Sequence, residues 1–322
     1  LKDVKTFEEL CSKFMTFIYN SVQMKSAEIC KSSVRYLLEM LNTCEAPALP
    51  IIWQGSWSIW STITEGAHSG VLTDNNTIMI LVEGLTELFK ARKDQFSQED
   101  VDMLIELNHK LIRCPPAMDV IMHPSTIQKA CLTLITTICS YSEQTYEHVF
   151  NELSSLLPSR ADIDEQLEMQ EREKYQSKNL PPPKMLYPPV KLATAVQKDL
   201  VECIIHAPES VQKKLYHRLV GVLGNMMLTK YIVFTRVDPN AKSMRNVTPP
   251  FYYPLWKSTI KLFESVISNS SKYFDKESDE ATVNQLWLDF CQAIETFLFP
   301  SESSTNPHGS DSGGMDSHNK PI

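Results

Sequence analysis

The sequence predicts an all-α protein, an α-solenoid built from HEAT-like or armadillo-like helical hairpins. Apolar residues recur at intervals of three and four along most of the chain, which is the spacing of one face of an α-helix. Only 9 glycines stand beside 19 prolines in 322 residues, which disfavours a turn-rich β architecture. The predicted hairpins span about 35 to 50 residues each, the unit size of HEAT and armadillo repeats.

The N-terminal third of the chain predicts two hairpins. Apolar residues at helical spacing run from Val4 to Ile18 and again from Ile29 to Leu41. The prolines in segment 46–50 end the second helix, because proline has no backbone N–H to continue it. The next two helices are predicted over residues 51–67, which hold three tryptophans, and 76–92.

The central part of the chain carries clearer helix boundaries. Ser97 and Asp100 match a capping box, in which each side chain accepts a hydrogen bond from the other residue's backbone amide. A helix is therefore predicted to follow Ser97 and to run to Ile112. Residues 127–138 and 146–156 carry the next two apolar stripes and predict a further hairpin.

Helical periodicity returns in the last third of the sequence. It covers residues 190–206 and 209–227, and after a loop over 238–250 it returns around 256–267 and 283–294. The whole chain then holds about eleven helices, a number that suits a stack of hairpins.

Four segments follow from this pattern. Residues 1–158 form an N-terminal helical-repeat segment and residues 190–300 a C-terminal one. Residues 159–189 are first acidic and then rich in proline, and we predict an exposed, partly helical linker there. Residues 301–322 are rich in Ser, Gly, Asn and His and are predicted to be disordered, because they hold too few apolar side chains to offset the entropy of ordering.

Charge and cysteine usage indicate a cytoplasmic protein that does not bind nucleic acid. The net charge is −8, whereas binding to phosphates requires a basic face. The eight cysteines are scattered and form no CxxC pair, which is typical of buried thiols in a reducing compartment. The helical pattern is already running at Leu1, so we expect a piece cut from a longer polypeptide.

Motifs of catalysis and cofactor binding are absent from the sequence. The string Asp311-Ser-Gly-Gly314 resembles the nucleophile loop of serine proteases, but it lies in the polar tail of a helical protein, and we interpret it as a coincidence. The eight histidines show no HExxH spacing, and no GxGxxG or Walker loop occurs. We therefore expect no enzyme activity, cofactor, metal or small-molecule substrate.

Aromatic residues in two places are candidates for partner binding. Trp53, Trp57 and Trp60 lie at helical spacing, and they would either pack between neighbouring hairpins or offer an aromatic anchor to a protein partner. Tyr187 follows the three prolines 181–183 in a segment that would either be a stiff spacer or dock as polyproline II in an aromatic groove.

Three basic residues on one predicted helix are a further candidate. Lys213, Lys214 and Arg218 are spaced so that their charges could point together toward an acidic partner or an anionic membrane. The alternative interpretation is an ordinary solvated face.

Four strings resemble one known family: Trp57-Ser-Ile-Trp60, Tyr187-Pro-Pro-Val-Lys191, Trp287-Leu-Asp-Phe290 and Phe297-Leu-Phe-Pro-Ser301. They are similar to strings in the C-terminal half of the monensin-sensitivity-two trafficking scaffolds, relatives of the large Arf guanine-nucleotide exchange factors. The resemblance covers nearly the whole chain. In that family a similar Phe-Leu-Phe-Pro string precedes a polar linker and further helices.

The resemblance implies a non-catalytic scaffold, peripheral on the trans-Golgi network and endosomes, that acts with Dopey-type partners in recycling from endosomes to the Golgi. It implies no catalysis, because the family lacks the Sec-seven domain of the exchange factors. It assigns no role to an individual residue. Two other functions stay open from the sequence: a segment of an importin-type nuclear-transport receptor, and a regulatory subunit of an enzyme.

Overall fold

The described part of the chain is all helical. In this computed structural model it covers residues 4–24, 26–43, 49–72, 74–118, 124–175, 190–232, 253–274 and 280–299. No strand occurs in these ranges. The all-α class that the periodicity predicts is therefore confirmed. The predicted disordered tail, 301–322, and the predicted loop over 238–250 lie outside the described residues.

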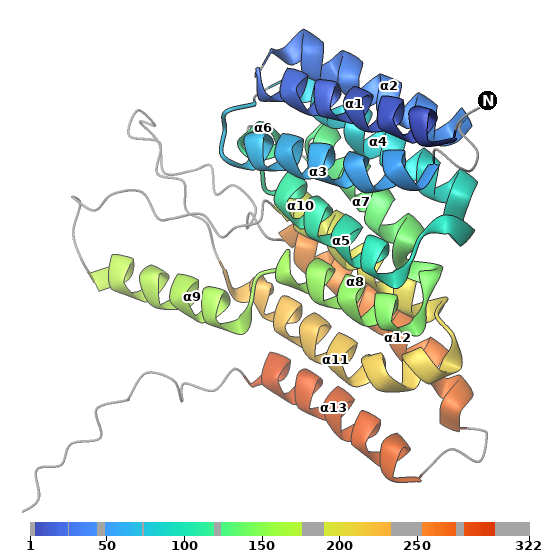
Figure 1. Ribbon diagram of the computed structural model, residues 1–322. Coiled ribbons are helices and arrows are strands. Elements are labelled where there is room, and N and C mark those ends of the chain that lie inside the picture. Colours follow the sequence, from blue (N-terminus) through green and yellow to red (C-terminus); the bar gives the residue numbers. More distant parts are fainter. Residues whose placement is uncertain are drawn as a thin grey trace, which may run out of the picture.

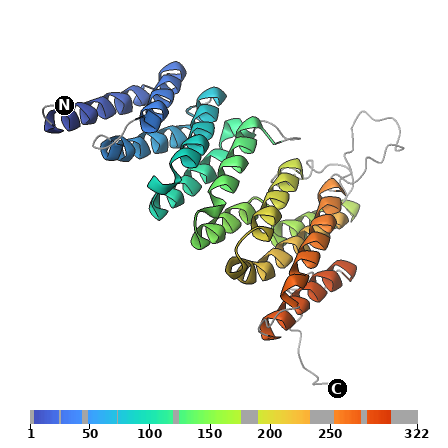
Figure 2. The same cartoon turned by 90° about the vertical axis from the view of Figure 1, so that its right-hand side faces the viewer.

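The helices form two layers that run side by side along the molecule (Figures 1 and 2). Each helix contacts the next one in its own layer, and consecutive helices of the two layers pair as hairpins. The first layer consists of α1 (Val4–Gln23), α3 (Leu49–His68), α5 (Gln98–Ile112), α8 (Glu143–Ser155), α11 (Glu209–Met227) and α13 (Glu280–Leu298). The second layer consists of α2 (Ala27–Thr43), α4 (Asn75–Arg92), α7 (Thr126–Ile138), α10 (Val190–Ile205) and α12 (Tyr253–Phe274).

Short elements connect some of these helices. They are η1 (Lys93–Gln95), α6 (Pro115–Met118), η2 (Cys139–Tyr141) and η3 (Leu228–Tyr231). The first helix α1 lies at one end of the stack and the last helix α13 at the other (Figure 2).

The predicted linker is an insertion within a hairpin. Helix α9 (Arg160–Tyr175) occupies its first half and projects from the side of the stack (Figure 1). Its start is not exposed as we expected: the side chain of Ile163 is fully buried, and α9 contacts η3. Because α8 and α10 contact each other directly, the helices before and after the insertion form one continuous stack. Residues 176–189 lie outside the described part.

Two helices begin with a capping box, one of which the sequence predicts. The Ser97 Oγ accepts a hydrogen bond from the Asp100 amide at 3.1 Å, and Asp100 Oδ2 accepts one from the Ser97 amide at 2.9 Å, so the predicted capping box is confirmed. Ser125 and Gln128 form a second capping box at the start of α7 that we did not predict. Each box satisfies amides that have no partner inside the helix.

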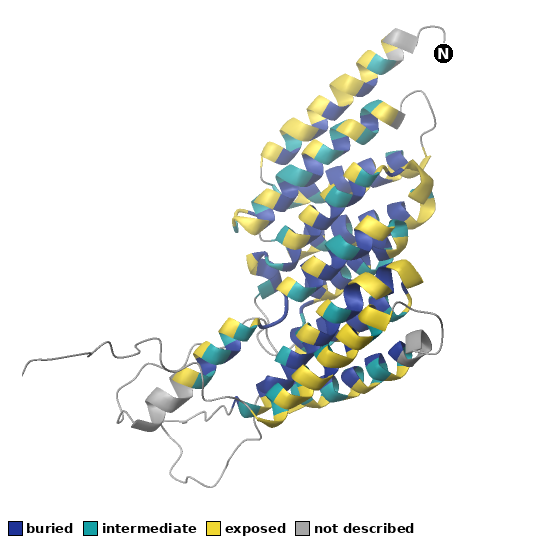
Figure 3. Cartoon of the chain, turned by 90° about the horizontal axis from the view of Figure 1, so that it is seen from below, coloured by how far each residue is buried: buried dark blue, intermediate teal, exposed yellow. Residues whose placement is uncertain are grey.

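The core runs through the stack between the two layers (Figure 3). Most helices bury the apolar stripe that their sequence predicts, for example Leu37 and Leu41 of α2 with Ile78 and Leu85 of α4. The stripe of α1 is buried only in part, because Leu10 and Phe17 are exposed. Burying one such side chain contributes about 1.5 to 3 kcal/mol. The stack is therefore held together mainly by apolar contacts between neighbouring helices.

Gly221 and Gly224 of α11 differ in how closely α13 approaches them. A Cβ added at Gly224 would lie 2.9 Å from the Cβ of Ala293 on α13, whereas one added at Gly221 would meet nothing within 4 Å. We expect Gly221→Ala to raise the free energy of unfolding by about 0.5 to 1 kcal/mol, because alanine is the better helix former. Gly224→Ala should lower it by about 1 to 2 kcal/mol, because overpacking outweighs the same gain. Urea denaturation of both variants checks this, and equal stability would contradict the close contact of α11 with α13.

Candidate protein-binding groove

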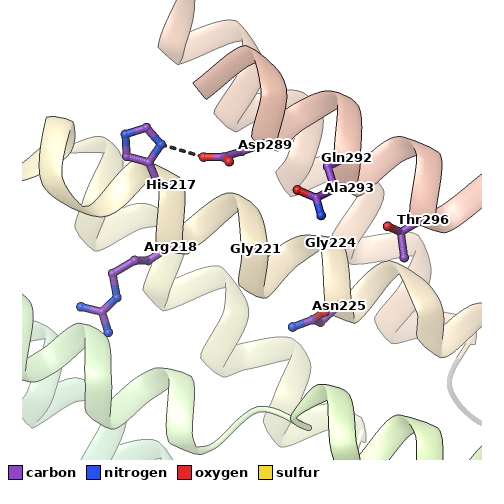
Figure 4. Close-up of a pocket in the computed structure, with 9 residues that line it drawn as sticks. All are labelled: His217, Arg218, Gly221, Gly224, Asn225, Asp289, Gln292, Ala293 and Thr296. Atoms are coloured by element: carbon purple, nitrogen blue, oxygen red, sulfur yellow. Dashed lines mark hydrogen bonds and ion pairs between the residues drawn. The ribbon is translucent and has the colours of Figure 1, made fainter. Parts of the chain in front are cut away.

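A groove most of whose lining residues are polar, with a volume of about 430 Å³, lies between α11 and α13 in the first layer (Figure 4). It is lined by His217, Arg218, Gly221, Gly224, Asn225, Asp289, Gln292, Ala293 and Thr296. The apolar side of α13 fixes its position, because Leu286 and Phe290 are buried in the core. Residues 289, 292 and 296 follow one another at intervals of three and four, so they lie on one side of α13 and face the groove.

One end of the groove is closed by a histidine–carboxylate contact between the two helices. His217 Nδ1 donates a hydrogen bond to Asp289 Oδ2 at 2.7 Å (Figure 4). Gln285 donates to the other carboxylate oxygen of Asp289 at 3.0 Å. Both oxygens of Asp289 are therefore occupied, and the side chain holds α13 against α11 rather than offering a charge to a ligand.

The remaining polar side chains of the groove are available to a ligand. The side chains of Asn225, Gln292 and Thr296 make no hydrogen bond with another described residue. Each amide side chain carries both donors and an acceptor, which is what the main chain of an extended peptide requires. Gly221 adds no side chain to the groove, so a peptide backbone can approach α11 closely there. This arrangement suits polypeptide binding.

The three residues of the predicted basic face are all exposed, but two of them have partners within the protein. Lys213 forms an ion pair with Glu209 one turn earlier on α11, at 2.9 Å. The guanidinium of Arg218 lies 4.5 Å from the ring centroid of Phe150 on α8 and donates a hydrogen bond to Asn151. The expectation that three charges point together is therefore wrong.

The physical reason lies in the helix period. Consecutive residues such as Lys213 and Lys214 are about 100° apart around a helix, so only Lys214 and Arg218 share a side. Arg218 is exposed but lies over Phe150 of α8, whereas Lys214 is exposed and has no ion pair to another described residue.

The three tryptophans of α3 pack within the protein. The ring of Trp53 lies 4.7 Å from that of Phe96, and its indole N–H donates to Asp100 at 3.2 Å. Trp57 and Trp60 are in edge-to-face contact at 5.0 Å. Trp60 is 0% exposed and therefore cannot anchor a partner, which corrects that expectation and supports packing between hairpins. Tyr187, the remaining candidate, lies outside the described residues.

Sequence reasoning missed the contacts that cross from one helix to the next in the first layer. His109 and Arg113 of α5 lie 2.7 Å and 2.6 Å from the two carboxylate oxygens of Glu152 on α8. His148 of α8 lies 2.9 Å from Asp102 of α5. The partners are about forty residues apart in sequence, so no local motif could have revealed them.

One carboxyl group in the second layer has a strongly shifted pKa. The pKa of Asp199 on α10 is raised from its ordinary 3.8 to about 6, chiefly by burial and also by the charge of Glu202, while Lys198 opposes the shift. Carboxyl groups with a shifted pKa often mark functional sites. Here burial is the largest cause of the shift, and Asp199 does not line the groove. We interpret Asp199 as a buried carboxyl group that lowers the free energy of unfolding when it is charged.

Other kinds of site find no support in the described ranges. No group of three or more His, Cys, Asp or Glu residues there could hold a metal ion. None of the helices in the same ranges has an apolar stretch that could span a lipid bilayer.

Comparison of the chain with protein-family models, with curated proteins and with solved structures finds no match. The class that the structure defines is an all-helical protein of two packed layers, with a polar groove in the first layer.

The shifted pKa of Asp199 predicts a pH dependence of stability. Native Asp199 keeps its proton up to about pH 6, whereas the unfolded residue loses it near 3.8, so the native state binds more protons between these values. The free energy of unfolding should fall as the pH rises through this window. Asp199→Asn should therefore stabilise the protein above pH 6 and leave stability unchanged below pH 4. Urea denaturation across this pH range measures it, with Glu264→Gln on α12 as the control for loss of an exposed carboxylate.

Arg218 and Lys214 make a matched pair for the packing of α11 on α8. Arg218→Ala removes the contact with Phe150 and the hydrogen bond to Asn151, and it should lower the free energy of unfolding by about 1 to 2 kcal/mol. Lys214→Ala should change it by less than about 0.5 kcal/mol, as surface substitutions usually do. Chemical denaturation compares the two, and an equal loss from both would show that Arg218 is only a solvated charge.

Proposed function

We propose that this chain is an α-solenoid of HEAT-like or armadillo-like repeats that works as a non-catalytic scaffold, binding other proteins in membrane trafficking between endosomes and the Golgi. The observation that carries the scaffold part is the polar groove between α11 and α13, where Asn225, Gln292 and Thr296 offer unused hydrogen-bonding groups. Stacked hairpins expose long surfaces and grooves, and they typically act by binding peptides or helices.

The trafficking part is supported by the resemblance of four strings to the monensin-sensitivity-two scaffolds. Two of these strings contribute Trp60 and Phe290, which are both buried in the core, so the resemblance includes packing positions of α3 and α13. On this proposal the protein is cytoplasmic and peripheral on the trans-Golgi network and endosomes, with Dopey-type proteins as partners. Contact with an anionic membrane would involve Lys214, which is exposed and forms neither an ion pair nor a ring contact with another described residue.

Proximity labelling in cells tests this function. The chain fused to a labelling enzyme should enrich Dopey-type proteins and markers of the trans-Golgi network over the labelling enzyme alone. A groove variant that combines Asn225→Ala, Gln292→Ala and Thr296→Ala should lose most of the Dopey-type signal, because the lost side chains supply the proposed hydrogen bonds. Its helical circular dichroism and melting temperature should stay unchanged.

A second triple variant serves as the control. Lys257→Ala, Lys261→Ala and Glu264→Ala alter exposed residues of α12, in the other layer, and should leave the labelling pattern intact. Enrichment of Ran and of nuclear-pore Phe-Gly proteins, with no Golgi markers, would replace the proposal by the importin-type alternative. Turnover of a substrate by the purified chain would contradict the non-catalytic role.

A further inference from the structure

The ammonium group of Lys230 lies among three aromatic rings. Its Nζ is 5.0 Å from the ring centroid of Phe297, 5.2 Å from that of Trp256 and 5.8 Å from that of Tyr231. At such distances a cation is attracted to an aromatic ring. The three rings come from α13, α12 and η3, so one lysine side chain joins three elements. We call Tyr231, Trp256 and Phe297 the aromatic cage.

The walls of the cage hold one another in place. The Tyr231 hydroxyl donates a hydrogen bond to the backbone oxygen of Phe297 at 2.6 Å. The ring of Trp256 is stacked on that of Phe297, with 6.5 Å between the centroids and 22° between the planes. All three rings are half-buried, and Leu255, next to Trp256, is fully buried in the core. The cage is therefore preorganised for a cation and does not depend on Lys230 to keep its shape.

The tryptophan at position 256 indicates that cation binding is the role of the cage. Its indole Nε1 is buried and has no hydrogen-bond partner among the described residues. A buried donor without a partner costs free energy. Phenylalanine or leucine would fill the same space without this cost, but indole is the ring that attracts a cation most strongly. Trp256 therefore contributes most when a cation lies in the cage.

An unmethylated lysine uses this cage only in part. Lys230 is exposed and forms no ion pair with another described residue. A primary ammonium group is strongly hydrated, so the attraction of the rings is largely offset by the water that it loses. Methylation keeps the positive charge and replaces N–H groups by methyl groups. The less hydrated ammonium then gains more from the rings, which is why aromatic cages bind methylated lysine.

We propose that Lys230 is a site of lysine methylation and that the aromatic cage holds its trimethylammonium group. The methyl groups come from a sulfonium donor bound to a protein methyltransferase. In each of three transfers a proton leaves Nζ, the nitrogen lone pair bonds to the methyl carbon, and the carbon–sulfur bond breaks with its electron pair on sulfur. Lys230 is exposed on the short element η3, where such an enzyme can reach it.

Lys230 itself is favoured as the occupant over a methylated lysine of another protein. It is attached to the cage through its own backbone, and Tyr231 of the cage is the next residue. The effective concentration of such a tethered group is on the order of millimolar or higher. An external ligand of the same chemistry would have to displace it.

Methylation of Lys230 would also fix the position of α13 on α11. The contact of His217 with Asp289 closes one end of the groove between these helices. The cage lies at the other end, because Phe297 directly follows the groove residue Thr296. A stronger contact in the cage would hold the groove at one width along its length. This consequence rests on the proposed function of the groove, whereas the methylation itself does not.

Mass spectrometry of the protein isolated from the cells that naturally express it tests the modification. The peptide that contains Lys230 should be found trimethylated. Lys257 and Lys261 of α12 are also exposed but lie outside the cage, so these matched controls should carry no methyl groups. Finding Lys230 only unmethylated overturns the proposal, and binding of tetramethylammonium chloride by Lys230→Ala would then assign the cage to an external ligand. Equal methylation of all three lysines also overturns it, because the cage would select nothing.

A second measurement determines whether a methylated Lys230 stays in the cage. Reductive methylation with isotope-labelled formaldehyde converts the lysines of the purified chain to dimethyl-lysine, whose methyl groups are observed by NMR. The ring currents of the cage should shift one methyl resonance upfield of the others. Lys230→Arg should remove this resonance, and Lys257→Arg should not. The lack of a shifted resonance that depends on Lys230 contradicts the proposal, whereas a methylated Lys230 in a chain that binds nothing in the groove contradicts only the proposed function.

Discussion

The structure depends on one constraint: the apolar sides of each helix must be covered by its neighbours. A hairpin such as α1–α2 cannot bury both of its stripes alone, so α3 and α4 complete the cover and in turn need the next pair. Contacts of α2 with α4 and of α4 with α7 continue this line along the second layer. The same constraint explains why the chain tolerates α9 at the tip of the α8–α10 hairpin, where an insertion interrupts no contact between layers.

Polar contacts have a second role in the first layer, where they set how neighbouring helices align. Glu152 is almost fully buried and is held by His109 and Arg113 of the preceding helix, so its negative charge is compensated. Removing one partner of a buried ion pair is costly because the other charge is left without compensation. Arg218 on Phe150 and His217 on Asp289 continue this series toward the end of the stack. Apolar burial supplies most of the stability, and these contacts select one alignment of the helices.

The sequence predicts the helices well because each apolar stripe is a local signal. The Ser97 capping box and the stripe that ends at Ile112 are local in the same way, and both are present in the structure. The groove could not be predicted, since its walls, Asn225 and Gln292, are about seventy residues apart and meet only when α13 packs on α11. The prediction of three charges pointing together was wrong for the same reason, because the environment of Arg218 is set by Phe150 on another helix. The role of Trp60 stayed open in the sequence, because an aromatic stripe has the same spacing whether it faces the core or a partner. In the structure Trp60 is buried.

The last helix combines both kinds of surface that this fold exposes. One side of α13 contributes Asp289, Gln292 and Thr296 to the polar groove, and another presents Trp287 and Leu298 to solvent. Among the described helices of its own layer, α13 contacts α11, so the groove between them depends on that contact. A ligand bound in the groove would touch both helices and favour one position of α13 against α11, so part of its binding free energy would go into ordering that helix.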